Sequence, residues 1–166
     1  MNMSNSVVSI LMCLFLAATG CVSVDISKSE VKKAAQVKIQ NPSSPFQEFS
    51  SDTVDRGWRN NRNGNTISYV SDCGNPYDPS LESIEAGVIS GLTGLKRVST
   101  EEGFFNDRAS RQSVFKGSVD GIPSQVQLLV FKKNNCIYVL SYIAVQKNYD
   151  TDLATFDKFL KGFVAP

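Results

Sequence analysis

The sequence has 166 residues, with 17 Lys and Arg against 16 Asp and Glu and a net charge of +1. This near-neutral balance argues against an electrostatic nucleic-acid binder, which would normally carry a strong basic excess. With 42% hydrophobic and 20% charged residues, the composition is that of a globular protein of single-domain size and excludes general disorder. No nucleic-acid partner is therefore expected.

An uncharged apolar stretch over residues 7–18 leads into Ala-Thr-Gly-Cys at positions 18–21. The stretch is shorter than the about 18–20 apolar residues that a membrane-spanning helix needs. Small residues directly before a cut are typical of a secretory signal peptide, because the peptidase cleft admits nothing bulky. A cysteine at the cut itself resembles the lipobox of bacterial lipoproteins. The resemblance implies that residues 1–20 are a signal peptide and that Cys21 carries the lipid.

The lipobox resemblance also implies which membrane holds the protein and which compartment the protein faces. Two or more acyl chains anchor a protein stably, and a lipoprotein cysteine carries a diacylglycerol thioether and an acylated amine. Val22-Ser23 lacks the Asp that retains such proteins at the inner membrane of enteric bacteria, which favours the outer membrane, facing the periplasm. Residues 1–9 contain no Lys or Arg, so an ordinary secreted protein is the alternative.

A mostly polar stretch over residues 21–45 separates the cysteine from the globular part. It predicts the lipidated cysteine and a flexible tether, with a root-mean-square span of roughly 25–30 Å, followed by a single domain over residues 46–166. Residues 37–39, Val-Lys-Ile, alternate in polarity. A first strand laid along the edge of the domain is therefore the alternative for this short segment.

The next segments predict a β-hairpin. Asn63-Gly64 favours the positive φ of a tight turn. After it, residues 66–71 alternate between polar and apolar, as a half-buried strand does. Before it, residues 56–62 place Arg56, Trp58 and Arg62 on one face of a strand.

A helix is expected over residues 78–95. Asp78 suits the N-cap, Pro79 suits the first helical position, and Gly94 suits the C-terminal end. Apolar residues recur between them at helical spacing.

The remainder predicts strands and a closing helix. Strands are expected over residues 95–100, 110–118, 124–132 and 136–145. The last two are apolar on both faces and should be central in the sheet. Asp150 is a candidate N-cap for an amphipathic helix over residues 151–162. The expected fold class is α+β, a mostly antiparallel sheet with one mid-chain helix and one C-terminal helix.

Four cysteines are present in the sequence. Cys13 would leave with the signal peptide and Cys21 would be lipidated, so Cys73 and Cys136 remain. An even pair in an oxidising compartment predicts a disulfide. The alternatives are two buried free thiols or a redox pair, although the usual C-x-x-C spacing of a redox pair is absent.

The order of elements resembles the PsbP-like fold. The resemblance is carried by the hairpin over residues 124–145 with its Gly-Ile-Pro entry at 121–123, the Phe-rich finish at 156–163, and the helix at 78–95. It covers about residues 55–166. Proteins of that fold are mostly assembly factors or non-catalytic binding modules, so the resemblance implies that the chain is not an enzyme. A widely shared fold assigns no function by itself.

Catalytic signals are weak. The sequence contains no histidine, which excludes Ser-His-Asp and Cys-His catalysis and histidine metal sites, and we expect no catalytic residue, metal or cofactor. The alternative is a small periplasmic hydrolase that uses loop carboxylates. Its candidates are Glu101, Glu102 and Asp107, expected in one loop, and Asp72, Asp78 and Asp120 in others.

Arg56, Trp58 and Arg62 form the candidate ligand patch. A Trp beside two arginines can stack on a sugar ring or hold an anionic group. The alternative, which we favour, is a core-facing Trp58 with arginine stems at its rim. The sequence therefore predicts a lipid-anchored, periplasm-facing lipoprotein with a non-catalytic binding or assembly-factor domain. Its candidate partners, besides the membrane, are an envelope protein or an anionic glycan.

Overall fold

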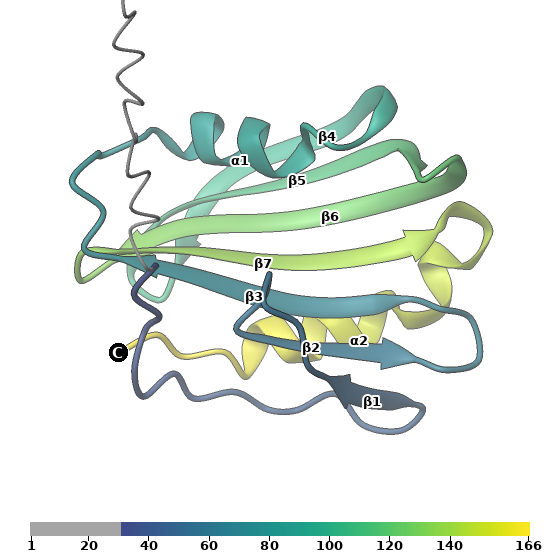
Figure 1. The fold of residues 1–166 in the computed structure, drawn as a ribbon, viewed down its shortest axis with the longest axis horizontal. Helices are drawn as coiled ribbons and strands as arrows, with labels where there is room; N and C mark the ends of the chain where they lie inside the picture. The colour runs from purple at the N-terminus through teal and green to yellow at the C-terminus, as the bar shows by residue number, and fades with distance from the viewer. Residues whose placement is uncertain (1–30) are drawn as a thin grey trace, which may run out of the picture. The chain divides into compact units, whose positions relative to one another are not determined.

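A computed structural model of the chain describes residues 31–166, and their backbone forms one seven-stranded antiparallel sheet. The strand order is β1-β2-β3-β7-β6-β5-β4, with α1 on one face of the sheet and α2 on the other (Figure 1). The elements are β1 (Phe46–Phe49), β2 (Arg56–Asn60), β3 (Thr66–Cys73), α1 (Leu81–Ile89), β4 (Thr93–Phe105), β5 (Arg108–Val119), β6 (Ile122–Lys133), β7 (Cys136–Val145), the 3-10 turn η1 (Gln146–Asn148) and α2 (Tyr149–Lys161). The expected α+β class is confirmed.

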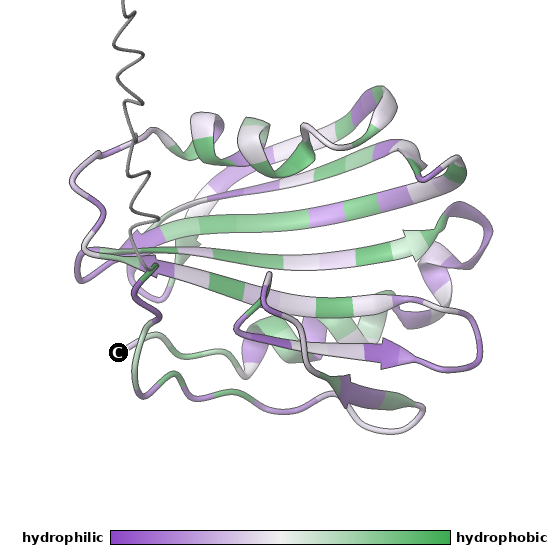
Figure 2. Cartoon of the chain, in the orientation of Figure 1, coloured by the Kyte–Doolittle hydropathy of each residue, from purple (hydrophilic) through white to green (hydrophobic). Residues whose placement is uncertain are grey.

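The larger core lies between the sheet and α2. Phe156 and Phe159 of α2 pack with Tyr138, Leu140 and Tyr142, which alternate along β7 and are buried. Figure 2 shows hydrophobic residues along β6 and β7 and more hydrophilic ones on β1 and β2. β7 has three strands on either side of it in the sheet, so the prediction that the two-sided apolar strands are central is confirmed.

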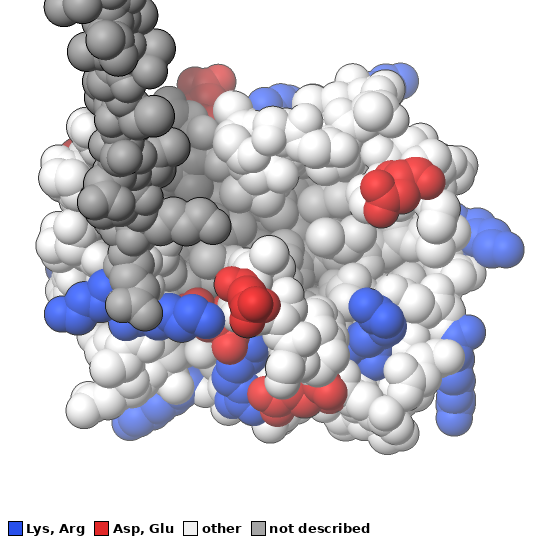
Figure 3. Space-filling view, in the orientation of Figure 1, with Lys and Arg blue, Asp and Glu red and all other residues white. Residues whose placement is uncertain are grey.

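A smaller core lies beneath α1, where Ile89 packs against Phe115 and Leu128. The helix contacts β5 and β6. Beside it, Val139 and Ile143 of β7 remain half-buried. Figure 3 views this face of the domain, and most of the surface visible over α1 carries neither Lys and Arg nor Asp and Glu.

The mid-chain helix is shorter than expected. It begins at Leu81, and Ser80 is its N-cap, with its hydroxyl accepting from the Ser83 N–H at 3.1 Å. Asp78 instead accepts from Lys132 Nζ at 2.6 Å. The helix ends at Ile89 because the residues from Thr93 onward pair with β5.

Residues 31–45, expected as part of the tether, lie along the domain. Lys38 and Val164 exchange backbone hydrogen bonds at 3.0 and 2.8 Å, and the Cys73 N–H donates to the Lys32 carbonyl at 2.8 Å. Val37 and Ile39 pack against the core, and Lys38 forms an isolated β-bridge with Val164. The segment therefore lies along the domain, as the alternative predicts, but it is not a strand.

The predicted signal peptide, residues 1–20, and the predicted lipidation site Cys21 lie outside the described residues. Within residues 31–166, no helix has both the length and the apolar character needed to cross a membrane.

The β2–β3 turn also binds α2. Gly64 takes a φ of 81° in the turn. Around it, Asn60, Asn63 and Asn65 each donate a side-chain hydrogen bond to one oxygen of Asp152, at 2.9, 2.8 and 2.7 Å. Asp152 is buried in the first turn of α2. The asparagine-rich segment therefore joins the hairpin to the helix through one carboxylate.

Replacing Asp152 with alanine should destabilise the fold by about 2–4 kcal/mol, because three amide donors would lose a buried acceptor. Urea denaturation measures the change. Asp150→Ala is the control, since Asp150 is exposed in the same helical turn and should cost less than about 1 kcal/mol. Equal losses in the two variants would show that the asparagine contacts contribute little.

Candidate functional site

β4 is a long strand with one free edge. It spans 13 residues, pairs with β5 and with no other strand among residues 31–166, and has most of its side chains exposed. The strand at the opposite edge, β1, has four residues. An unpaired edge presents backbone N–H and C=O groups that another chain can pair with. We call Thr93–Phe105 the β4 edge.

Exposed apolar side chains are concentrated on the β4 edge. Leu95, Val98 and Phe104 are three of the eight exposed large hydrophobic residues within residues 31–166, and Phe104 is 85% exposed. Phe104 lies near the end of the strand, before the turn into β5. Exposed apolar residues grouped on one element mark an interaction surface more often than scattered ones do.

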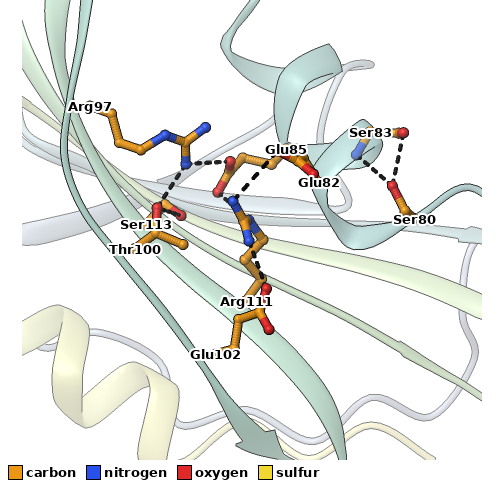
Figure 4. Close-up of polar contacts among 9 residues, drawn as sticks. All are labelled: Ser80, Glu82, Ser83, Glu85, Arg97, Thr100, Glu102, Arg111 and Ser113. Carbon is orange, nitrogen blue, oxygen red and sulfur yellow. Dashed lines mark hydrogen bonds and ion pairs between the residues drawn. The ribbon is translucent and has the colours of Figure 1, made fainter.

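A buried ion cluster holds β4 to its neighbours. Glu85 projects from α1 toward the sheet and is 0% exposed (Figure 4). Its carboxylate contacts Arg97 Nη1 of β4 at 2.7 Å and Arg111 Nε of β5 at 3.4 Å. The Glu85 cluster, meaning Glu85, Arg97 and Arg111, therefore joins the helix to both strands.

Further polar contacts fix the two arginines. Arg97 Nη1 also donates to Thr100 Oγ1 at 2.7 Å, and the Arg97 guanidinium lies 4.7 Å from the centre of the Phe115 ring. Arg111 Nη1 donates to Glu102 at 2.8 Å. Since each guanidinium is already paired with a carboxylate, the cluster is suited to positioning β4 rather than to binding a free anion.

Glu85 remains ionised at neutral pH. Burial alone would raise the pKa of its carboxyl. The neighbouring Ser113 hydroxyl and the charges of Arg97 and Arg111 lower that pKa by more, so the net shift is downward. A buried carboxylate held between two guanidinium groups is the usual condition under which a charge is tolerated inside a protein.

An open pocket of about 520 Å³ adjoins the Glu85 cluster, between the start of α1 and the end of β4. Phe104, Glu82 and Glu102 line it, with Arg111 between the two carboxylates. Arg111 contacts Glu82 at 3.9 Å and Glu102 at 2.8 Å. The pocket thus brings together two acids of the kind that a hydrolase would use.

Apart from Glu102, the carboxylates predicted from the sequence lie away from this pocket. Glu101 and Glu102 were expected in a loop, which is wrong, because both pair with β5 as part of β4. Asp107 follows in the turn, with a φ of 62°. Asp72 and Asp78 line a separate pocket of about 280 Å³. There Asp72 accepts a hydrogen bond from Asn75, and Asp78 accepts one from Lys132. Asp120 lies in the β5–β6 turn, with a φ of 49°. No group of acids and cysteines in residues 31–166 is arranged to hold a metal ion.

Cys73 and Cys136 form a disulfide. Cys73 is the last residue of β3, Cys136 is the first residue of β7, and the two are direct partners in the antiparallel register. The predicted pairing is therefore confirmed.

Trp58 is buried, as the core alternative predicts. Its ring is 2% exposed and lies 5.6 Å from that of Phe159. The Arg56 guanidinium lies 4.9 Å from the centre of the Trp58 ring and donates to both carboxylate oxygens of Glu48. Arg62 is not on the same strand face, because β2 ends at Asn60 and the chain turns there. The buried ring leaves no open aromatic face for stacking.

The buried role of Glu85 was not predicted from the sequence. The pattern that could have indicated it is a charged residue at an apolar position of the helix, because Leu81, Glu85 and Ile89 follow one another at a spacing of four on one face. Such a residue predicts a buried partner of opposite charge, but it does not say which arginine supplies the partner.

No protein-family model matches the sequence, and a search of curated proteins also finds no match. Solved structures do resemble it. The cyanobacterial PsbP of Synechocystis superposes with a TM-score of 0.59 at 9% identity, covering 80% of this chain and 90% of that one. LpqN, involved in cell envelope biogenesis of Mycobacterium tuberculosis, gives 0.58 at 14% identity over 78% and 83%. PA94 of Pseudomonas aeruginosa, a protein of unknown function, gives 0.52 at 10% identity over 76% and 85%. These likenesses show that the chain has a PsbP-like fold.

Proposed function

We propose that this chain is a lipid-anchored protein of the bacterial envelope, facing the periplasm, whose domain binds a protein partner and carries out no catalysis. The lipobox-like residues 18–21 support the anchor. The PsbP-like fold supports a binding or assembly role, and one structural neighbour, LpqN, is described as involved in cell envelope biogenesis.

The observation that carries the binding proposal is the β4 edge. A strand of 13 residues with a free edge and three exposed apolar side chains suits strand addition, in which backbone hydrogen bonds supply affinity and side chains supply specificity. The Glu85 cluster connects β4 to α1 and β5 in the free domain, and an edge positioned before binding has less conformational entropy to lose.

The anchor is tested by metabolic labelling. Expressed in a Gram-negative host, the wild-type chain should incorporate a palmitate analogue and partition into detergent. Cys21→Ala should do neither. Equal labelling of this variant would overturn the lipid anchor, whatever the domain binds.

The binding surface is tested by capture of partners from solubilised membranes with the anchored protein. Val98→Asp should reduce recovery of a co-purifying protein at least about tenfold, because a charge would enter an apolar strand contact. Tyr77→Ala is the matched control, since Tyr77 is also highly exposed but lies in the loop before α1. If both variants recover the partner like wild type, the β4 edge is not the binding surface.

A small hydrolase is the second candidate, supported by Glu82 and Glu102 in the open pocket. An acid/base mechanism needs one carboxyl that carries a proton. Arg111 contacts both carboxylates, and both side chains are largely exposed. This arrangement resembles a surface ion network, so we favour the binding function.

A further inference from the structure

We propose that the β4 edge pairs antiparallel with the β4 edge of a second copy of this chain, so that the sheet continues across a two-fold axis. The inference rests on the proposed function, for which it names the partner. It is carried by the order of charges along the strand, by the faces on which they lie, and by their lack of partners within the domain.

The charges of β4 are self-complementary. Lys96 and Arg97 lie in its first half, Glu101 and Glu102 lie in its second half, and three uncharged residues separate the pairs. An antiparallel second copy runs in reverse, so the basic half of the strand in each copy lies along the acidic half in the other, and Lys96 can lie opposite Glu101. A two-fold interface requires this kind of self-complementary patch. An edge that only had to repel other strands would be served equally well by charges of one sign.

Lys96 and Glu101 lie on the same face of the sheet. Lys96 pairs with Lys116 of β5, and Glu101 pairs with Gln112. Lys116 and Gln112 are four residues apart on one regular strand and share a face. Lys96 and Glu101 are five apart, and their shared face results from the register shift between Arg97 and Ser99. Because directly opposed residues in an antiparallel pair share a face, Lys96 of one copy can lie opposite Glu101 of the other.

Lys96 and Glu101 have no ion-pair partner in the part of the chain that the structure describes. Arg97 and Glu102 belong to ion pairs on the α1 side. Among residues 31–166, by contrast, neither Lys96 nor Glu101 is in an ion pair. Lys96 lies opposite Lys116, and like charges in that position destabilise a sheet. Glu101 of a second copy would offset this repulsion.

The same register brings apolar surface together. Pairing Lys96 with Glu101 places the two-fold axis at the register shift between Arg97 and Ser99, beside Val98. Val98 is half exposed in the domain, and beside the axis it would lie close to the Val98 of the second copy. Apolar contact at the centre, with charge pairs at both ends, is the usual anatomy of a protein interface.

Charge reversal tests the pairing on the full chain, purified in detergent and followed by sedimentation velocity across a concentration series. Wild type should form dimers. Lys96→Glu alone and Glu101→Lys alone should each weaken dimerisation about tenfold or more, since each creates two like-charge contacts per dimer. The double variant, with both reversals, should return to within about threefold of wild type. Lys147→Glu, away from β4 in η1, is the control and should not change dimerisation.

The outcomes separate this inference from the proposed function. A wild-type chain that stays monomeric at all concentrations, or a double variant that stays as weak as the single ones, overturns self-pairing. If the chain is monomeric while Val98→Asp still abolishes capture of a different protein, the binding function holds and its partner is another protein. Circular dichroism of every variant shows that the fold is retained.

Discussion

Replacing Glu85 with alanine should lower the free energy of unfolding by about 3–5 kcal/mol, the cost of removing one partner from a buried ion pair. The variant would leave the guanidinium groups of Arg97 and Arg111 without the carboxylate that lies at 2.7 and 3.4 Å from them. Urea denaturation followed by circular dichroism measures the loss. Because the cluster joins α1 to β4 and β5, the variant should also weaken any binding at the β4 edge.

Glu82→Ala is the matched control for Glu85→Ala. Glu82 is on the same helix and 3.9 Å from Arg111, but its side chain is largely exposed. Exposed ion pairs contribute little, so the expected loss is below about 1 kcal/mol. A Glu85 variant that is no less stable than the Glu82 variant would contradict the structural role of the cluster.

The pH dependence of stability gives the Glu85 prediction a second measurement. The folded-state pKa of Glu85 is lowered from its ordinary value of 4.5. The stabilisation that this shift represents is fully present above the ordinary pKa and is lost as the pH falls through the lowered one. Glu85→Gln should therefore be less stable at neutral pH, and its stability should fall less steeply below about pH 4.5 than that of wild type.

Removing the disulfide should cost about 4 kcal/mol in the chain-entropy model, because the bond closes a long loop in the unfolded chain. Cys73 and Cys136 are 63 residues apart in sequence. The double variant Cys73→Ser with Cys136→Ser, compared with wild type by urea denaturation without reductant, measures the loss. The β3–β7 pairing should fray at this end, where Cys73 also binds the Lys32 carbonyl.

Reductant provides the control for the disulfide. It should destabilise wild type to about the level of the double serine variant and leave that variant unchanged. Intact mass after alkylation without reductant should show neither Cys73 nor Cys136 modified. Alkylation of both in native material would contradict the disulfide.

The regular elements of the sheet centre followed from local pattern. β7 spans Cys136–Val145 as expected, because a strand that is apolar on both faces can be recognised from a run of consecutive residues. The end of α1 could not be derived in the same way. Leu92 and Leu95 continue a helical spacing, but the pairing of β4 with β5, far along the chain, gives that segment its backbone hydrogen bonds. Intrinsic preference is a weak determinant when a strand partner is present.

The sequence by itself determined the lipobox-like motif, the α+β class and the cysteine pair, because each depends on residue types or on spacing along the chain. Tertiary structure decided the Glu85 cluster and the asparagine contacts to Asp152, which join residues as far apart as Asn60 and Asp152. It also decided that Trp58 is buried and that β4 is an edge. Burial, charge pairing and strand order depend on which segments meet in space, and no local pattern specifies which segments those are.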